Sequence, residues 1–196
     1  MIDTPEKVEN ITFDKMPGSP CPPPRGMQPR PGQVVCGDID MRIAADGTWY
    51  YGGTPIHRQK LVKLFSTVVR RDEAGAYWLI TPAEMARIKV DDAPFLAVEM
   101  SDTNDKDVIG LKFRTNVDKW VRADIDHPIR VDIDPETDEP RPYIQLASDG
   151  TEARIVRSVF YDLVEKAEVA EMDGRSMLIV KSAGATFVLG PAPEEA

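Results

Sequence analysis

The fold is decided by the stretch GDIDMRIAADGTWYY, residues 37–51. Apolar and charged residues alternate over residues 38–43, which is the period of a half-buried strand. Asp46-Gly47 then predicts a hairpin turn, because both central residues of a type I′ turn have positive φ. The alternation resumes after this turn, so the stretch predicts two antiparallel strands at the start of the folded body.

Helix start signals follow strands at three places. A capping side chain followed by apolar residues at i, i+3 and i+4 is typical of an amphipathic helix. The three predicted helices begin at Thr54-Pro55 (apolar face Leu61, Leu64, Phe65 and Val68), at Thr81 with a capping box and an end near Arg87, and at residues 149–152 (apolar face Ile155, Val159, Phe160 and Leu163). Asp173-Gly174 is expected to end the last helix, and a closing hairpin is expected around Ala183-Gly184.

The order strand, turn, strand, capped helix and strand occurs twice. Residues 61–63 (LVK) match residues 155–157 (IVR), an offset of 155 − 61 = 94. The sequence therefore predicts an α+β fold of two repeated β-hairpin-plus-helix modules, with mostly antiparallel sheets and a roughly equal share of helix. The predicted parts are a proline-rich N-terminal arm (1–36), a first module (37–117), a second module (118–190) and a tail (191–196).

The N-terminal arm holds eight of the seventeen prolines, and its charges cancel. This composition is typical of an extended segment that is partly polyproline II. Two interpretations stay open: a tail that wraps the body or stays mobile, and a proline-motif ligand for a partner protein.

Composition and charge exclude several classes of protein. The 196 residues are 42% hydrophobic with a net charge of −9, which is ordinary for a soluble globular protein. The surplus of acids argues against nucleic acid and anionic membranes as partners, and no apolar run reaches the roughly 18 residues of a membrane helix. No secretory signal is visible, so a cytoplasmic location is expected. Two cysteines and two histidines fit no zinc pattern, so we expect no metal and no cofactor.

Charge is unevenly distributed. Residues 118–139 contain eight acids and three bases, which is over half of the net charge. The spacing of Asp132, Asp134 and Glu136 is similar to that of a calcium loop, but Thr137 and Tyr143 stand where an EF-hand needs Gly and Glu. An acidic hairpin turn is therefore expected. Residues 57–71 contain five Lys or Arg and no acid, for which a solvated helix face is the simpler interpretation.

Five residues are candidate ligand contacts: Trp78, Thr115, Asn116, His127 and Arg130. Trp78 can offer a stacking face, with core packing as the alternative. Arg130 can hold a carboxylate or phosphate bidentately. His127 can be a general acid–base, a ligand contact or a structural histidine. The chain has no nucleophile elbow and no phosphate-loop fingerprint, so no catalytic residue is assigned.

Several motifs in combination resemble a known family. They are GTWYYGGTPI (47–56), LVKLF (61–65), YWLITP (77–82), DAPF (92–95), TNV (115–117) and HPIRV (127–131). The chain resembles, over about residues 37–190, an uncharacterised proteobacterial family known only as domain of unknown function 1285. The resemblance implies an α+β fold with repeated structural motifs and a place in signal transduction, and it assigns no catalytic residues.

These observations favour a cytoplasmic, non-enzymatic protein with a ligand-sensing or regulatory role. It would bind a small polar or anionic molecule between the two modules, at the five candidate residues, and a signalling protein is a second candidate partner. The first alternative is an enzyme that uses His127 as acid–base, which requires a nearby carboxylate and a pocket. The second alternative is a protein-interaction adaptor that docks through the arm or through the basic stretch.

Overall fold

A computed structural model describes residues 22–105 and 108–193, and its contacts divide the chain into two compact units, Met1–Asp92 and Ala93–Ala196. The division falls 25 residues before the expected boundary after Val117. The physical reason is strand pairing, because the strands over residues 95–115 pair within the second unit. Residues 1–21 of the predicted arm and 194–196 of the tail lie outside the described residues.

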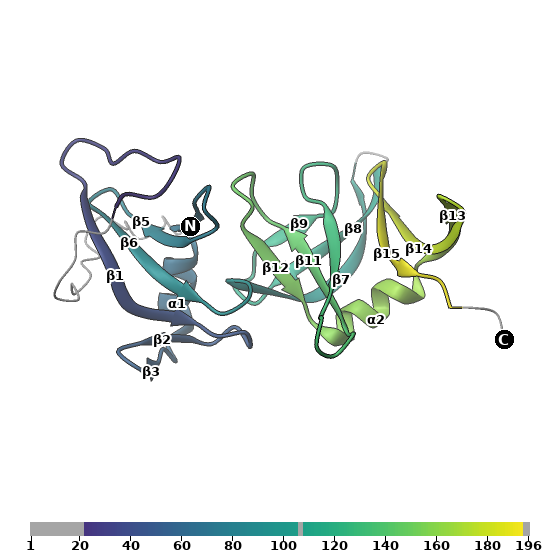
Figure 1. Cartoon of the computed structure of the whole chain (residues 1–196), viewed down its shortest axis with the longest axis horizontal. Coiled ribbons are helices and arrows are strands. Elements are labelled where there is room, and N and C mark those ends of the chain that lie inside the picture. Colours follow the sequence, from purple (N-terminus) through teal and green to yellow (C-terminus); the bar gives the residue numbers. More distant parts are fainter. Residues whose placement is uncertain (1–21, 106–107, 194–196) are drawn as a thin grey trace, which may run out of the picture. The chain divides into compact units, whose positions relative to one another are not determined.

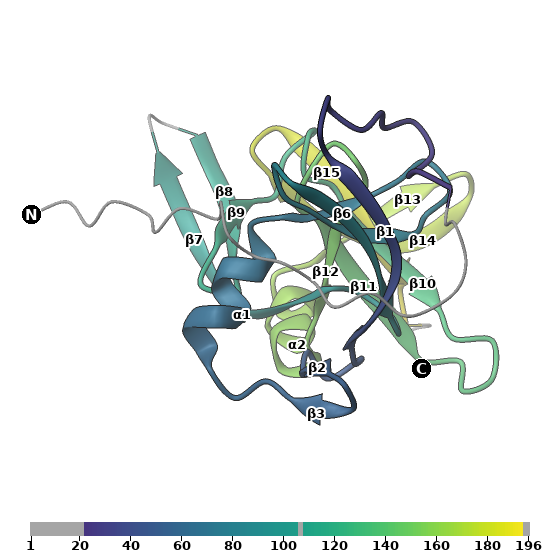
Figure 2. The ribbon, with the colours of Figure 1, turned by 90° about the vertical axis from the view of Figure 1, so that its left-hand side faces the viewer.

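The first unit is a six-stranded sheet with one helix (Figures 1 and 2). Its elements are β1 (Val34–Ile43), β2 (Trp49–Tyr51), β3 (Thr54–Pro55), α1 (Gln59–Ser66), β4 (Val69–Arg71), β5 (Tyr77–Ile80) and β6 (Glu84–Val90). The strand order is β3-β2-β1-β6-β5-β4. The core is closed by Trp49, whose ring stacks on Phe65 of the helix with centroids 6.3 Å apart.

The second unit contains two sheets and one helix. Its elements are β7 (Phe95–Asp105), β8 (Val108–Thr115), β9 (Trp120–Arg122), β10 (Ile129–Ile133), β11 (Pro140–Gln145), β12 (Glu152–Ile155), α2 (Arg157–Glu165), β13 (Glu168–Met172), β14 (Arg175–Ser182) and β15 (Ala185–Pro191). The larger sheet has the order β10-β11-β12-β7-β8-β9, and the smaller has the order β13-β14-β15. Phe113, Ile144 and Leu163 are completely buried in this unit.

The two six-stranded sheets share one topology. In each, the first strand lies in the centre, the next two run out to one edge, and the last three return from the other edge to the centre. The first and last strands pair in parallel, as β1 with β6 and β7 with β12, while the other pairs are antiparallel. The predicted repeat is therefore present in the sheets, although strands outweigh helix.

The two helices occupy different places in this shared topology. Helix α1 lies between β3 and β4, whereas α2 comes after β12, when the second sheet is already complete. The match of residues 61–63 with 155–157 therefore pairs helices that are not equivalent, and the predicted offset of 94 is wrong as a repeat length. The described helices, of eight and nine residues, are too short to cross a membrane.

Three predicted helix starts are strands or turns. Thr54-Pro55 forms β3, and α1 begins only at Gln59. The Thr81 hydroxyl does accept the N–H of Glu84 at 3.0 Å, as a cap would, but the chain continues into β6. Residues 152–155 form β12, and α2 starts at Arg157. A cap motif thus predicts a local hydrogen bond, but whether the next residues form a helix or a strand depends on their pairing with other strands.

Turns along the chain differ from prediction in a similar way. At Asp46-Gly47 only the glycine has positive φ (81°), so this turn is not type I′. Asp173-Gly174 has φ of 52° and 74° and joins β13 to β14 as a two-residue turn. The prediction that it ends a helix is wrong, because α2 ends eight residues earlier, at Glu165. The expected hairpin around Ala183-Gly184 is confirmed, as is the acidic hairpin between β10 and β11.

Candidate functional site

The candidate residues are distributed over both units. Trp78 lies in β5 of the first unit. The other four belong to the second unit, with Thr115 at the end of β8, Asn116 directly after it, His127 before β10, and Arg130 within β10. Each of the five contacts other residues of its own unit, and these contacts define what each side chain is available to do.

Trp78 is 2% exposed, and its indole N–H donates to Asp72 Oδ2 at 2.9 Å. Asp72 also accepts the backbone N–H of Arg25 (3.3 Å), Ala74 (2.9 Å) and Ala76 (2.8 Å). Burial would raise the pKa of Asp72, but these hydrogen bonds outweigh burial and hold the pKa below its usual value. One carboxylate therefore connects Trp78, the turn before β5 and the chain around Arg25.

The described part of the predicted arm, residues 22–33, contacts both ends of β5. The N–H of Glu73 donates to Arg25 O at 3.2 Å, and the Gln33 amide donates to Thr81 O at 2.6 Å. Trp78 pairs with Arg87 across the sheet, on the face opposite to that of the buried Leu79. Residues 22–33 therefore contact the chain on both sides of the strand that carries Trp78.

Thr115 and Asn116 stabilise the backbone where β7 and β8 meet. The Thr115 hydroxyl is buried and accepts the N–H of Lys119 at 3.0 Å. The Asn116 side-chain oxygen accepts the N–H of Leu96 at 3.1 Å, and the Asn116 N–H donates to Leu96 O at 2.8 Å. Both residues thus replace ladder hydrogen bonds at a strand end.

His127 lies in the turn between β9 and β10, beside Asp124. The ring Nδ1 is 3.0 Å from Asp124 Oδ1, which also accepts the backbone N–H groups of Asp126 and His127. Burial would raise the pKa of Asp124, but the hydrogen bonds from His127 lower it below its usual value. The carboxylate that the enzyme hypothesis requires is present, and it also closes the turn.

Arg130 is held between two acids. Its guanidinium donates two hydrogen bonds to Glu152, both at 2.7 Å, contacts Asp132, and lies 4.2 Å above the ring centre of Tyr143. The hydrogen bonds to Glu152 raise the pKa of Arg130 above its usual value. An anionic ligand would have to displace a carboxylate that already binds bidentately.

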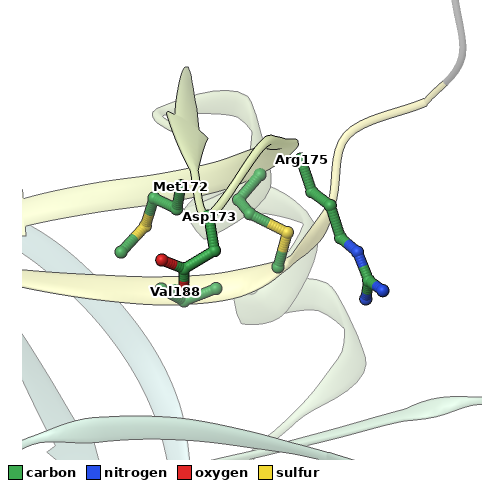
Figure 3. Close-up of a pocket in the computed structure, with 5 residues that line it drawn as sticks. Met172, Asp173, Arg175 and Val188 are labelled. Carbon is green, nitrogen blue, oxygen red and sulfur yellow. The ribbon is translucent and has the colours of Figure 1, made fainter.

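A hollow of about 370 Å³ lies on the three-stranded sheet (Figure 3). It is lined by Met172, Asp173, Arg175, Met177 and Val188. Figure 3 shows Met172 and Asp173 on the side of Val188, with Arg175 extending away from them. Sequence reasoning missed this surface because Asp173-Gly174 was interpreted as a helix end. As a hairpin turn, the same dipeptide places Met172 and Met177 on one face.

Strand β13 lies beside the hollow and is the outermost strand of this sheet. Val169 is 65% exposed and Met172 is 42% exposed. Among residues 22–105 and 108–193, no strand pairs with the outer edge of β13, and no group of three or more His, Cys, Asp or Glu side chains is placed to hold a metal ion. The hollow and the adjoining edge of β13 thus form one exposed surface of the second unit, although Ile109 (77%) and Ile125 (82%) of the same unit are more exposed side chains.

Two family models match this chain. Residues 29–93 match the N-terminal domain of a family described as a domain of unknown function, DUF1285, and residues 94–189 match the C-terminal domain of the same family. The chain belongs to the DUF1285 family. The resemblance found in the sequence is thereby confirmed, and the two matched DUF1285 domains meet one residue from the boundary between the compact units.

Two solved DUF1285 structures are similar to the chain. A DUF1285 family protein from Silicibacter pomeroyi DSS-3 has a TM-score of 0.71 and 40% identity, covering 86% of this chain and 91% of its own. A DUF1285 family protein from Shewanella baltica OS155 has a TM-score of 0.52 and 26% identity, covering 65% of this chain and 91% of its own. A search of curated proteins gives no match. The DUF1285 descriptions name no activity, so function has to be argued from the site.

Proposed function

We propose that this DUF1285 protein is a non-enzymatic regulatory protein of the cytoplasm, and that it acts by binding a partner protein on its three-stranded sheet. The observation that carries the proposal is the hollow of Met172, Met177 and Val188 beside the exposed strand β13. Methionine side chains are flexible and polarisable, and they are frequent at surfaces that adapt to partner proteins.

The form of the hollow supports a protein side chain as its occupant. It is shallow and open to solvent, whereas sites for small molecules enclose most of the ligand surface. Met172, Met177 and Val188 line it together with Asp173, whose carboxylate lies beside Val188, and with Arg175, which extends away from them (Figure 3). Mixed apolar and charged side chains are common at protein–protein interfaces.

The test is photo-crosslinking in cells from a benzoylphenylalanine at position 172. We expect one protein to be captured reproducibly from position 172 and not from the exposed position 40 of β1. The Met177→Asp variant should lose this capture and should not complement a deletion strain, because it places a charge among the apolar side chains of the hollow. Equal capture by the Met177→Asp variant would refute docking in the hollow.

Sensing of a small polar or anionic ligand is the second candidate function. Two observations favour it: the hollow has the volume of a small-molecule site, about 300–1,000 Å³, and Arg175 at its rim can pair with an anionic group. Binding at the five residues named from the sequence would require Arg130 to release Glu152. A thermal-shift screen of metabolites separates the candidates. A compound whose stabilisation is lost in Arg175→Ala supports the hollow, and one whose stabilisation is lost in Arg130→Ala supports the sequence-based site.

A further inference from the structure

The turn at Asp173-Gly174 determines which backbone groups of β13 face outward. A two-residue turn closes on a hydrogen-bonded pair, here Met172 with Arg175. Hydrogen-bonded pairs alternate along an antiparallel ladder, so Ala170 and Glu168 also direct their backbone groups towards β14. Val169 and Glu171 therefore present their N–H and C=O groups to the outer edge, where no strand of the described residues pairs with them.

The outer edge of β13 carries little of the usual protection of edge strands. Exposed edges are generally guarded by charged side chains, lysine above all, by proline, by a bulge or by a covering loop, because unpaired backbone groups attract another strand. β13 has the sequence EVAEM, without lysine or proline, and its pairing to β14 is regular. Its acids, Glu168 and Glu171, are the only charged groups on the strand, and Glu168 is paired with Lys181 at 2.7 Å.

The charge on this edge discriminates between possible occupants. A second copy paired antiparallel about Ala170 would bring the two Glu171 side chains to diagonal positions, about 7–8 Å apart, where like charges repel. A strand with Lys or Arg opposite Glu171 would instead form an attractive pair. Ala170 and Met172 lie on the other face of β13, where Met172 lines the hollow, so the incoming strand would present apolar side chains there.

We propose that β13 accepts an extended segment of a partner protein as a fourth strand of this sheet, with basic residues on the side of Glu171 and apolar residues over the hollow. Such strand addition takes its affinity from backbone hydrogen bonds and its specificity from alternate side chains. The proposal rests on the proposed function and adds the binding mode and the chemistry of the partner segment.

The test uses the full chain labelled with ¹⁵N and the peptide acetyl-KVKVKVK-amide as the probe. In the free protein the amides of Val169 and Glu171 should exchange rapidly, and saturating peptide should slow their exchange at least tenfold. The Val169→Pro variant should weaken peptide binding at least tenfold, because it removes one outward N–H and leaves the bonds to β14 intact. Val169→Thr retains the N–H and the β-branched shape, so it should bind normally.

A second peptide keeps the test independent of how Val169→Pro folds. The same sequence with its central lysines N-methylated on the backbone has equal charge, but in the antiparallel register it cannot donate to the edge, because the lysines opposite Val169 and Glu171 carry the N–H groups that face β13. It should bind at least tenfold more weakly. Equal binding of both peptides, or binding without protection of Val169 and Glu171, would overturn strand addition. If strand addition fails but Met177→Asp abolishes peptide binding, the proposed function of docking in the hollow still holds. If Met177→Asp binds the peptide normally, the proposed function fails as well. Protection that grows with protein concentration, without peptide, would overturn the proposal in favour of a second copy.

Discussion

Replacing Asp72 with alanine should strongly destabilise the first unit, because one carboxylate accepts four N–H donors. The Trp78 indole N–H would stay buried without an acceptor, which costs about 1–3 kcal/mol. The N–H groups of Arg25, Ala74 and Ala76 lie at more accessible positions, where water replaces the carboxylate at a loss of about 0.5 kcal/mol each. The expected loss of unfolding free energy is about 3 kcal/mol.

The measurement is urea unfolding of the full chain, followed by tryptophan fluorescence and circular dichroism. A loss of about 3 kcal/mol also corresponds to a fall in Tm of roughly 12–24 °C for a unit of this size. Asp72→Asn keeps one acceptor oxygen and should fall between alanine and wild type. Asp40→Ala is the matched control, because Asp40 is exposed on β1, and it should change stability by about 0.5 kcal/mol or less.

The comparison of Asp72→Ala with its control tests the role of the carboxylate. If Asp72→Ala loses no more stability than Asp40→Ala, then the buried carboxylate does not hold Trp78 or the segment around Arg25. An equal loss in the alanine and asparagine variants would show that the negative charge matters, and that hydrogen-bond acceptance by a neutral oxygen does not suffice.

Four further outcomes are expected. Acid should destabilise the first unit as pH falls below about 4, because the pKa of Asp72 is lower in the folded than in the unfolded state. The stabilisation by the Asp72 carboxylate is complete above the unfolded pKa of about 3.9 and is lost as pH falls through the folded pKa. Urea midpoints measured against pH should therefore fall less in acid for Asp72→Asn than for wild type. Arg25→Pro, which suits the turn but removes the N–H to Asp72, should lose about 1 kcal/mol, and Arg25→Ala much less, in urea unfolding. Ser182→Ala should lose about 2–3 kcal/mol in the same assay, since it strips partners from Leu111 N and Ala123 O. Gly110→Ala should lower Tm, because its Cβ would lie 2.9 Å from Ser182 Oγ.

Strands were predictable wherever local pattern and pairing agree. The alternation over residues 38–43 predicts β1, and its hairpin with β2 is confirmed. The two halves of the C-terminal hairpin were also located, because Ala183-Gly184 has the positive φ values that a two-residue turn requires. In each case the information lies within about ten residues of the chain.

The errors arose where long-range pairing overrides a local signal. The Thr81 hydroxyl forms the hydrogen bond that its motif predicts, yet β6 is a strand because it pairs in parallel with β1, about 50 residues earlier. The parallel pair in each sheet is invisible to periodicity for the same reason. The hollow could not be predicted, because Asp173-Gly174 can either end a helix or join two strands. Pairing of β14 with β13 and β15 makes it a turn between strands, and this pairing is not visible in the local sequence.

The three-stranded sheet is the part of the fold that stands outside the repeat, and this is why we assign binding to it. Both six-stranded sheets are complete without it. It is attached through β14 and β15: the Ser182 hydroxyl accepts the N–H of Leu111 and donates to Ala123 O, while β15 lies against β10. Because β14 and β15 make these attachments, β13 is the strand of the sheet that lies farthest from the six-stranded sheet of the second unit, and its outer edge is exposed. A strand that only completed a core would be buried on one face, whereas β13 has no fully buried residue. This exposure of β13 is what the proposed strand addition requires.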